Sequence, residues 1–231
     1  MGETWRLLLG LVGSFVAGYL GSALGLVLGT LRLPLILLAA GNPAAGAGTN
    51  IAISAAAAGA GGLRHAREGR VDWRIVAWMA PPPVIGAVVG SLASPHISHR
   101  LLYGVIVVVL FWSAIDLAFR PIKPRARAKP RLVAAAVSGA GIGAIGGAIR
   151  VILGTLRMPA LVQSVGIDIR TAAGTNLVVG FMLGVAGFAS RAASLEVDWT
   201  LLAAGLVGAI PGAWLGAPAL RQSGRSGSRW Q

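Results

Sequence analysis

Residues 27–34 read VLGTLRLP, and residues 152–159 read ILGTLRMP. The two stretches differ only at their first and seventh positions, and each contains one arginine in an otherwise almost wholly apolar sequence. A charged side chain is costly to place in apolar surroundings unless it finds a partner there. The occurrence of Arg32 and Arg157 at matched places in the two halves of the chain therefore predicts that they share a role.

The composition of the chain predicts an integral membrane protein. Of its 231 residues, 55% are hydrophobic and only 12% are charged, and the mean hydropathy is +0.76. Soluble domains usually contain about 25% charged residues. Apolar runs of about 18 or more residues recur along the chain, which is typical of transmembrane helices. We therefore expect an all-α integral membrane protein that resides in a lipid bilayer.

The positive charge is concentrated between the apolar runs. A net charge of +13 would suggest nucleic-acid binding in a soluble protein, but here the positive-inside rule accounts for it, and no nucleic-acid partner is expected. The most basic segments are 64–74 and the proline-rich linker 120–131. Both are predicted to lie in the cytoplasm, in a multi-pass protein of the cell (inner) membrane.

The apolar runs predict seven transmembrane helices and two shorter pieces. The seven long runs are 6–28, 44–63, 73–94, 101–119, 132–150, 170–189 and 198–219. The short runs, 33–41 and 158–166, follow the two arginines. Because a hydrocarbon core is about 30 Å thick, the short runs are too short to span it and are expected to be half-helices or re-entrant segments.

Four sequence matches, in the same order and at a nearly constant separation, indicate an internal duplication. GTLRLP at 29–34 matches GTLRMP at 154–159, AGTN at 47–50 matches 173–176, VDW at 71–73 matches 197–199, and GAVVG at 86–90 matches GAWLG at 212–216. The predicted division is a first repeat at 1–119, the basic cytoplasmic linker at 120–131, a second repeat at 132–220 and a polar basic tail at 221–231. Four full spans in the first repeat predict that the repeats are parallel.

The second repeat lacks a counterpart of helix 101–119. After GAWLG the chain continues as APALRQSGRSGSRWQ, which is too polar to span a membrane. The sequence is compatible with a truncated or frameshifted end and equally with a natural seven-span variant.

The arginine motifs predict a binding site for a small anion. Pro34 and Pro159 lack an N–H and are expected to unwind the backbone beside Arg32 and Arg157. The two guanidinium groups would then face one another across the repeat axis and hold an anion with several oxygens. The alternative is that the arginines extend to the membrane interface and contact phospholipid headgroups.

Other residues of the repeated motifs complete the predicted site. They are Gly29, Gly154, Thr30, Thr155, Thr49, Asn50, Thr175 and Asn176. Thr49–Asn50 and Thr175–Asn176 have an alternative role as caps of the helices that follow. Asp72 and Asp198 of the VDW motifs are expected to be structural N-caps. The G-x-x-x-G pairs, Gly86/Gly90 and Gly212/Gly216, predict close helix packing.

Catalysis, metal binding and cofactor binding are not predicted. No nucleophile–base pair or phosphate-binding loop is present, and the chain has no cysteine. The three histidines, His65, His96 and His99, fall in expected loops without further metal ligands nearby. We therefore expect a protein that is not an enzyme and needs no cofactor, and whose oligomeric state is left open, a homo-oligomer included.

The repeated unit resembles the sulfite exporter TauE/SafE family. A glycine-rich helix leads into a short apolar segment with a proline, then a GT motif, a basic loop, VDW and a G-x-x-x-G helix, and the unit occurs twice over about residues 8–220. The resemblance implies an inner-membrane transporter, usually of eight spans, for sulfite, sulfonates or related organic anions. This chain departs from the family's G-x-G-G-G string, with GLVLGTLR and RVILGTLR in its place, and it lacks the last helix.

A permease that moves small anions through a site at the repeat interface is the function that these patterns favour. The alternatives are a channel-like anion pore and a truncated family member that does not transport. A pore would carry flux without saturation, whereas a permease would saturate.

Overall fold

The computed structural model describes residues 2–85, 104, 108, 111, 130–148, 154–193 and 197–218. Regular structure in these residues is entirely helical, with no strand. Three of the described helices are long and apolar enough to cross a membrane, namely Glu3–Leu24, Ile169–Ala189 and Trp199–Gly216. The expected all-α membrane class is thereby confirmed.

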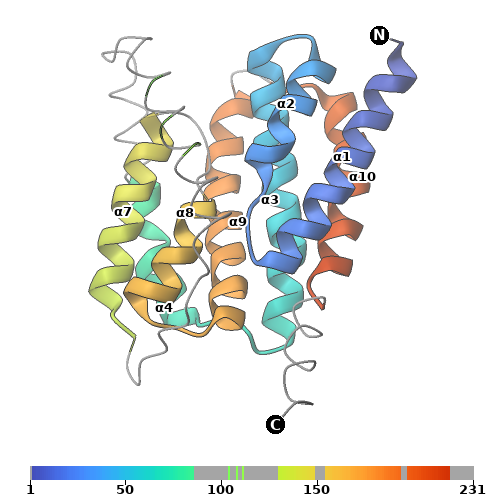
Figure 1. The fold of residues 1–231 in the computed structure, drawn as a ribbon. Helices are drawn as coiled ribbons and strands as arrows, with labels where there is room; N and C mark the ends of the chain where they lie inside the picture. The colour runs from blue at the N-terminus through green and yellow to red at the C-terminus, as the bar shows by residue number, and fades with distance from the viewer. Residues whose placement is uncertain are drawn as a thin grey trace.

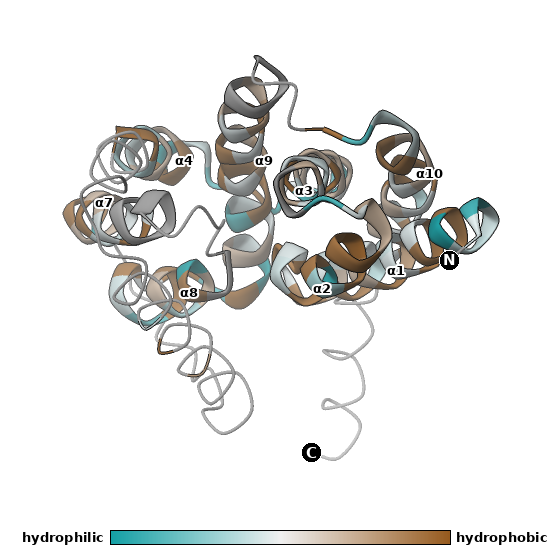
Figure 2. Ribbon diagram, turned by 90° about the horizontal axis from the view of Figure 1, so that it is seen from above, coloured by the Kyte–Doolittle hydropathy of each residue, from teal (hydrophilic) through white to brown (hydrophobic). Residues whose placement is uncertain are grey.

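The helices are arranged in two lateral groups around a central pair. They are α1 (Glu3–Leu24), α2 (Gly29–Ala40), α3 (Pro43–Arg67), α4 (Trp73–Met79), α7 (Leu132–Ala148), α8 (Gly154–Pro159), the π-helical turn η2 (Ala160–Val165), α9 (Ile169–Ala193) and α10 (Trp199–Gly216). Seen from above, α3 and α9 lie in the centre (Figure 2). Helices α1, α2 and α10 flank the pair on one side, and α4, α7 and α8 flank it on the other (Figures 1 and 2).

Helices α1 and α2 form an antiparallel hairpin. Gly25 ends α1 in the left-handed region, at φ 68°, and its N–H donates to the carbonyls of Gly21 and Ser22. The chain then returns, so that Arg6 near the start of α1 contacts Ala39 near the end of α2. Helix α2 has 12 residues, about 18 Å at 1.5 Å per residue, which agrees with the expectation of a short segment.

The predicted unwinding at the prolines is wrong. Pro34 and Pro159 both lie inside helices, and the first break precedes Arg32, at residues 25–28. A glycine in the left-handed region can end a helix without strain, whereas a proline near a helix start removes only one hydrogen bond. In the second half, the helix continues past Pro159 as η2 and ends at Gly166, with φ 86°.

The two central helices run in opposite directions. A side-chain carbon added at Gly184 of α9 would meet Ala55 of α3, and one added at Gly59 of α3 would meet Phe181 of α9. Residue numbers therefore rise along α3 as they fall along α9. These helices contain the two matching AGTN stretches. This opposite course differs from the one that parallel repeats predict, in which the two AGTN helices would run in the same direction. Helix α2 brings the chain back to the end at which α1 begins, a return that was not counted as a crossing in that prediction (Figure 1).

The glycines of α10 allow it to pack directly on the backbone of α1. Side-chain carbons added at Gly208, Gly212 and Gly216 would collide with the carbonyl oxygens of Leu11, Phe15 and Tyr19. Small residues at every fourth position let two helix backbones approach closely. The expected close packing at Gly212 and Gly216 is thus confirmed, while Gly86 and Gly90 lie outside the described residues.

The helix expected at 73–94 is interrupted. Helix α4 ends at Met79, and residues 81–85 are helical again after a bend at Ala80. Pro81, Pro82 and Pro83 follow the bend, and prolines cannot donate the backbone hydrogen bonds that would continue the helix. Residues 86–94, the expected span 101–119 except for three helical positions, the linker up to residue 129 and the tail from residue 219 lie outside the described residues.

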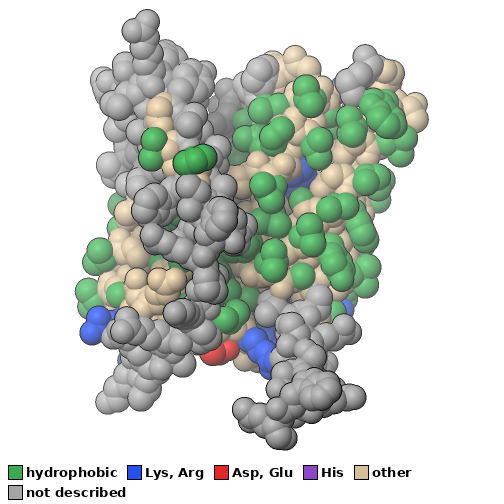
Figure 3. All heavy atoms as spheres, in the orientation of Figure 1, with side chains coloured by type: hydrophobic (Ala, Val, Ile, Leu, Met, Phe, Trp, Pro, Cys, Tyr) green, Lys and Arg blue, Asp and Glu red, His purple; other side chains and the backbone are tan. Residues whose placement is uncertain are grey.

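The outer surface suits a lipid environment. Helix α1 exposes Val12, Val16 and Leu20, and hydrophobic side chains cover much of the face shown in Figure 3. Charged side chains are visible mainly at the lower end of that view, and Arg64 and Arg67 lie in the last turn of α3. A band of apolar side chains with charges toward one end is what a bilayer-embedded helix bundle requires.

Candidate functional site

Arg32 is buried and fully engaged by α3. Its exposed fraction is 2%. Its Nε donates to Asn50 Oδ1 at 3.0 Å, and its Nη2 donates to Asn50 O at 3.0 Å and to Ser54 Oγ at 2.8 Å. Asn50 Nδ2 in turn donates to Gly29 O at 2.9 Å, so the arginine, the asparagine and the start of α2 form one network.

Arg157, on α8, occupies a corresponding place against α9 but has fewer partners. Its exposed fraction is 1%, and its Nε donates to Asn176 Oδ1 at 3.0 Å. Asn176 Nδ2 donates to Gly25 O at 2.8 Å, so this network reaches across to the break in the other half of the chain. Among the described residues, Nη2 of Arg157 is buried without a hydrogen-bond partner.

Neither arginine is neutralised by a carboxylate in the described part of the chain. The ion pairs there are Arg6–Asp198, Arg64–Glu68 and Arg70–Glu68. Buried charges are normally paired or neutralised, since an isolated buried ion is costly. Two guanidinium groups held only by neutral acceptors therefore provide a region of positive potential inside the bundle.

A narrow pocket adjoins Arg32. Its lining includes the polar side chains of Arg32 and Ser54. Val27, Ala58, residues of α1 and Leu177 of α9 also line it. In this conformation the free space is close to that of about one water molecule. The pocket is thus polar at the arginine and apolar toward α9.

The motif threonines contact the opposite half of the chain instead of the arginines. The backbone N–H of Asp198 donates to Thr49 Oγ1 at 2.8 Å, and the backbone N–H of Asp72 donates to Thr175 Oγ1 at 3.1 Å. Each GT motif thus binds the VDW motif of the other half. The alternative capping role of these threonines is wrong, because α3 and α9 begin at Pro43 and Ile169, more than one turn before them.

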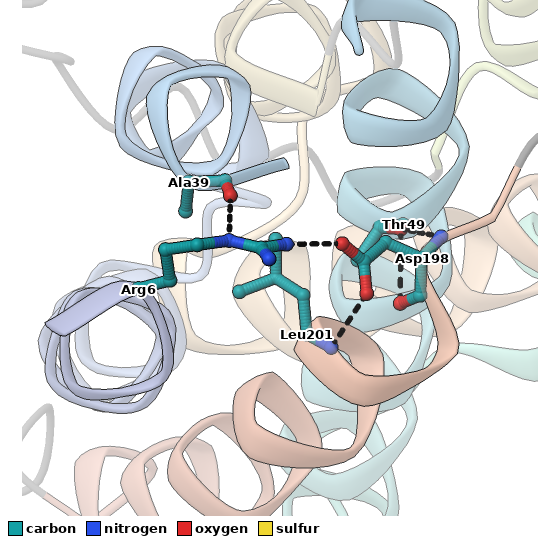
Figure 4. Close-up of polar contacts among 5 residues, drawn as sticks. All are labelled: Arg6, Ala39, Thr49, Asp198 and Leu201. Atoms are coloured by element: carbon teal, nitrogen blue, oxygen red, sulfur yellow. Dashed lines mark hydrogen bonds and ion pairs between the residues drawn. The ribbon is translucent and has the colours of Figure 1, made fainter. Parts of the chain in front are cut away.

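Asp72 and Asp198 act as the expected N-caps. The Asp72 side chain accepts from the N–H groups of Arg74 and Ile75, and the Asp198 side chain accepts from Leu201 N. Asp198 also pairs with Arg6 Nη2 at 2.6 Å, while Arg6 Nε donates to the Ala39 carbonyl (Figure 4). This Arg6 bridge connects the ends of α1, α2 and α10 at the upper end of the molecule.

The structure brings together some of the predicted site residues. Arg32, Asn50 and the Gly29 carbonyl form one group, and Arg157 with Asn176 forms the second. Thr30 is only half-buried, Gly154 begins α8, and the side chain of Thr155 is outside the description. Sequence reasoning missed Ser54, although it follows Asn50 by one helical turn and so shares its face, and it missed Gly180, which occupies the matching place after Asn176.

No metal-binding cluster is present among the described residues, where no group of three or more His, Asp or Glu side chains comes together. His65 is a correction to the expected loop placement, because it lies within α3 and is fully buried. Its Nε2 is 3.4 Å from the Ser22 carbonyl. Gly174 on α9 has no side chain, and a carbon added there would lie 3.0 Å from His65 Cβ and would collide with the Arg70 carbonyl oxygen.

Comparison with known proteins finds membrane transporters among the relatives of this chain. The chain is 29% identical over 211 residues to a "Probable membrane transporter protein" of Xylella fastidiosa (strain 9a5c), covering 86% of this chain and 80% of that protein. It is 27% identical over 176 residues to the "Probable membrane transporter protein YdhB" of Bacillus subtilis, covering 74% and 72% respectively. No solved structure matches the chain significantly. A model of the sulfite exporter TauE/SafE family matches residues 8–229, and the chain therefore belongs to this family of membrane transporters.

Proposed function

We propose that the protein is a multi-pass permease of the cell membrane that moves small anions, of the class of sulfite and organic sulfonates. The observation that carries the proposal is the pair of buried arginines without carboxylate partners among the described residues. An anion that enters the bundle would supply the missing negative charge. Such a site favours a planar or tetrahedral oxyanion, because a guanidinium presents several N–H donors in a fixed fork.

The positions of the two arginines support a shared region of positive potential. Arg32 Nη2 binds Ser54 on α3. Arg157 Nη2 lies 3.1 Å from the point that a side-chain carbon of Gly180 would occupy, and Ala58 on α3 lies 3.8 Å from the same point. Ser54 and Ala58 are one helical turn apart, about 6 Å along α3. Both guanidinium groups therefore adjoin neighbouring turns of the central helix pair.

The proposal includes two inverted repeats related by an axis in the membrane plane. Inverted repeats are supported by the matched sequence stretches and by the antiparallel course of α3 and α9. They are also supported by the reciprocal threonine contacts, Thr49 with Asp198 and Thr175 with Asp72. In inverted-repeat transporters, substrate sites lie near mid-membrane where helices are broken. We place the substrate site beside the corresponding break of this chain, at residues 25–28 before α2.

Transport assays in liposomes containing the purified chain test the proposal. We expect saturable uptake of sulfite or a small sulfonate that the double variant Arg32→Gln/Arg157→Gln reduces by about tenfold or more, since each change removes a charge-assisted hydrogen bond. Arg74→Gln removes an exposed arginine and is the matched control with wild-type uptake. Flux that rises linearly without saturation would indicate a pore instead, and absence of flux for every anion would overturn the proposal.

A further inference from the structure

The surroundings of the two buried arginines differ at the matched positions 54 and 180. On α3, Ser54 follows Asn50 by one turn and accepts a hydrogen bond from Arg32 Nη2 at 2.8 Å. On α9, Gly180 follows Asn176 by one turn, and it has no side chain to offer. Arg157 Nη2 is consequently buried without a partner in the described part of the chain. A buried guanidinium donor left unsatisfied is costly, which makes an external acceptor favourable there.

The free donor of Arg157 lies just beyond the pocket beside Arg32. A side-chain carbon at Gly180 would lie 2.6 Å from Val27 Cγ2, 3.1 Å from Arg157 Nη2 and 3.8 Å from Ala58 Cβ. Val27 and Ala58 also line the pocket that contains Arg32. Val27, in the break between α1 and α2, thus adjoins both the pocket and the point at Gly180 that the Arg157 donor also adjoins.

We propose that Arg157 is the arginine that binds the anion, through Nη2 at the space left by Gly180, while Arg32 is held in place by Ser54 and positions the pocket. The inference rests on the proposed function and assigns different roles to its two arginines. The ligand class is a small oxyanion, one oxygen of which accepts from Nη2. Val27 is displaced when the anion passes from the pocket to this donor, so the size of residue 27 controls access.

Anion-dependent thermal stabilisation of the detergent-purified protein tests this assignment, with sulfite and methanesulfonate as probes. A ligand that binds only the folded state raises Tm in a concentration-dependent way. We expect Gly180→Ser to weaken the apparent affinity by about tenfold, because the new hydroxyl supplies the missing acceptor. Gly180→Ala adds the same carbon without the hydroxyl and separates crowding from hydrogen bonding.

Two further comparisons keep the test independent of folding defects. Val27→Ala is expected to strengthen binding severalfold, a gain that misfolding cannot produce. Arg157→Gln is expected to abolish the anion-dependent rise in Tm, whereas Arg32→Gln lowers Tm without anion and retains most of that rise.

The outcomes distinguish the two proposals. Equal loss of the anion response in Arg32→Gln and Arg157→Gln, or an affinity unaffected by Gly180→Ser, would overturn the assignment to Arg157 and leave the anion permease intact. If no probe anion stabilises the wild-type protein, and liposome flux is also absent, the proposed function itself fails.

Discussion

Arg32 and Arg157 stand in nearly identical sequences and receive different surroundings. Asn50 on α3, which holds Arg32, is anchored to Gly29 at the start of α2, the helix that carries Arg32. Asn176, which holds Arg157, is anchored to Gly25 in the other half of the chain. The first site is therefore built within one half, whereas the second depends on how the two halves pack. A repeated motif can thus keep its residues while its hydrogen bonds diverge.

This comparison predicts that the second site is more sensitive to loss of its asparagine. Asn176→Ala removes the hydrogen bond to Arg157 Nε and leaves a buried charge with no partner among the described residues, so we expect a loss of about 3–5 kcal/mol in unfolding free energy. Asn50→Ala leaves Arg32 its bonds to the Asn50 carbonyl and to Ser54, and a loss of about 1–2 kcal/mol is expected. Denaturant unfolding in detergent measures both, and equal losses would contradict the difference between the sites.

The contact between the first break and the second site can be tested at Gly25. Gly25→Ala places a side chain in the left-handed region and against Cβ and Cα of Ala173, and about 2–4 kcal/mol of stability is expected to be lost from both effects. Gly41 has a similar φ of 66° with nothing near its missing side chain. Gly41→Ala is therefore the matched control and should cost only about 1–2 kcal/mol.

The same variant sharpens the comparison of the two sites. Because the Gly25 carbonyl accepts from Asn176, Gly25→Ala is expected to weaken anion stabilisation more than Gly41→Ala does. The anion-dependent rise in Tm, compared between the two variants, checks this expectation. An equal rise in both would show that the break at Gly25 does not affect anion binding at Arg157.

The smallest predicted difference concerns the two VDW aspartates. Asp72→Ala removes an N-cap, which costs about 1 kcal/mol. Asp198→Ala removes an N-cap and the pair with Arg6, whose side chains are partly exposed at 33% for Arg6 and 17% for Asp198. An additional loss of no more than about 1 kcal/mol is expected for a partly exposed pair. The unfolding free energy of Arg6→Gln measures the contribution of the ion pair alone. If this variant is as stable as the wild type, the Arg6 bridge does not stabilise the protein.

The amino-acid sequence by itself determined the membrane class, the short apolar segments beside the two arginines and the caps at Asp72 and Asp198. It also singled out Arg32, Arg157, Asn50 and Asn176. These features follow from composition, from run length and from residue types at fixed local spacing, which act within a few turns of the chain. A local pattern is sufficient for them because their hydrogen bonds and lengths are set by near neighbours.

Only the tertiary structure decided the direction of the second half, the place of the break and the difference between the arginines. Direction depends on whether α2 returns along α1, which contacts such as Arg6 with Ala39 establish. The threonines could not be assigned to opposite halves from spacing, because Thr49 meets Asp198 only after α10 packs beside α3. The roles of Ser54 and Gly180 depend on the guanidinium group that lies beside each of them. A serine or glycine on an exposed helix face has little effect, whereas beside a buried charge it decides whether a hydrogen bond to that charge is made.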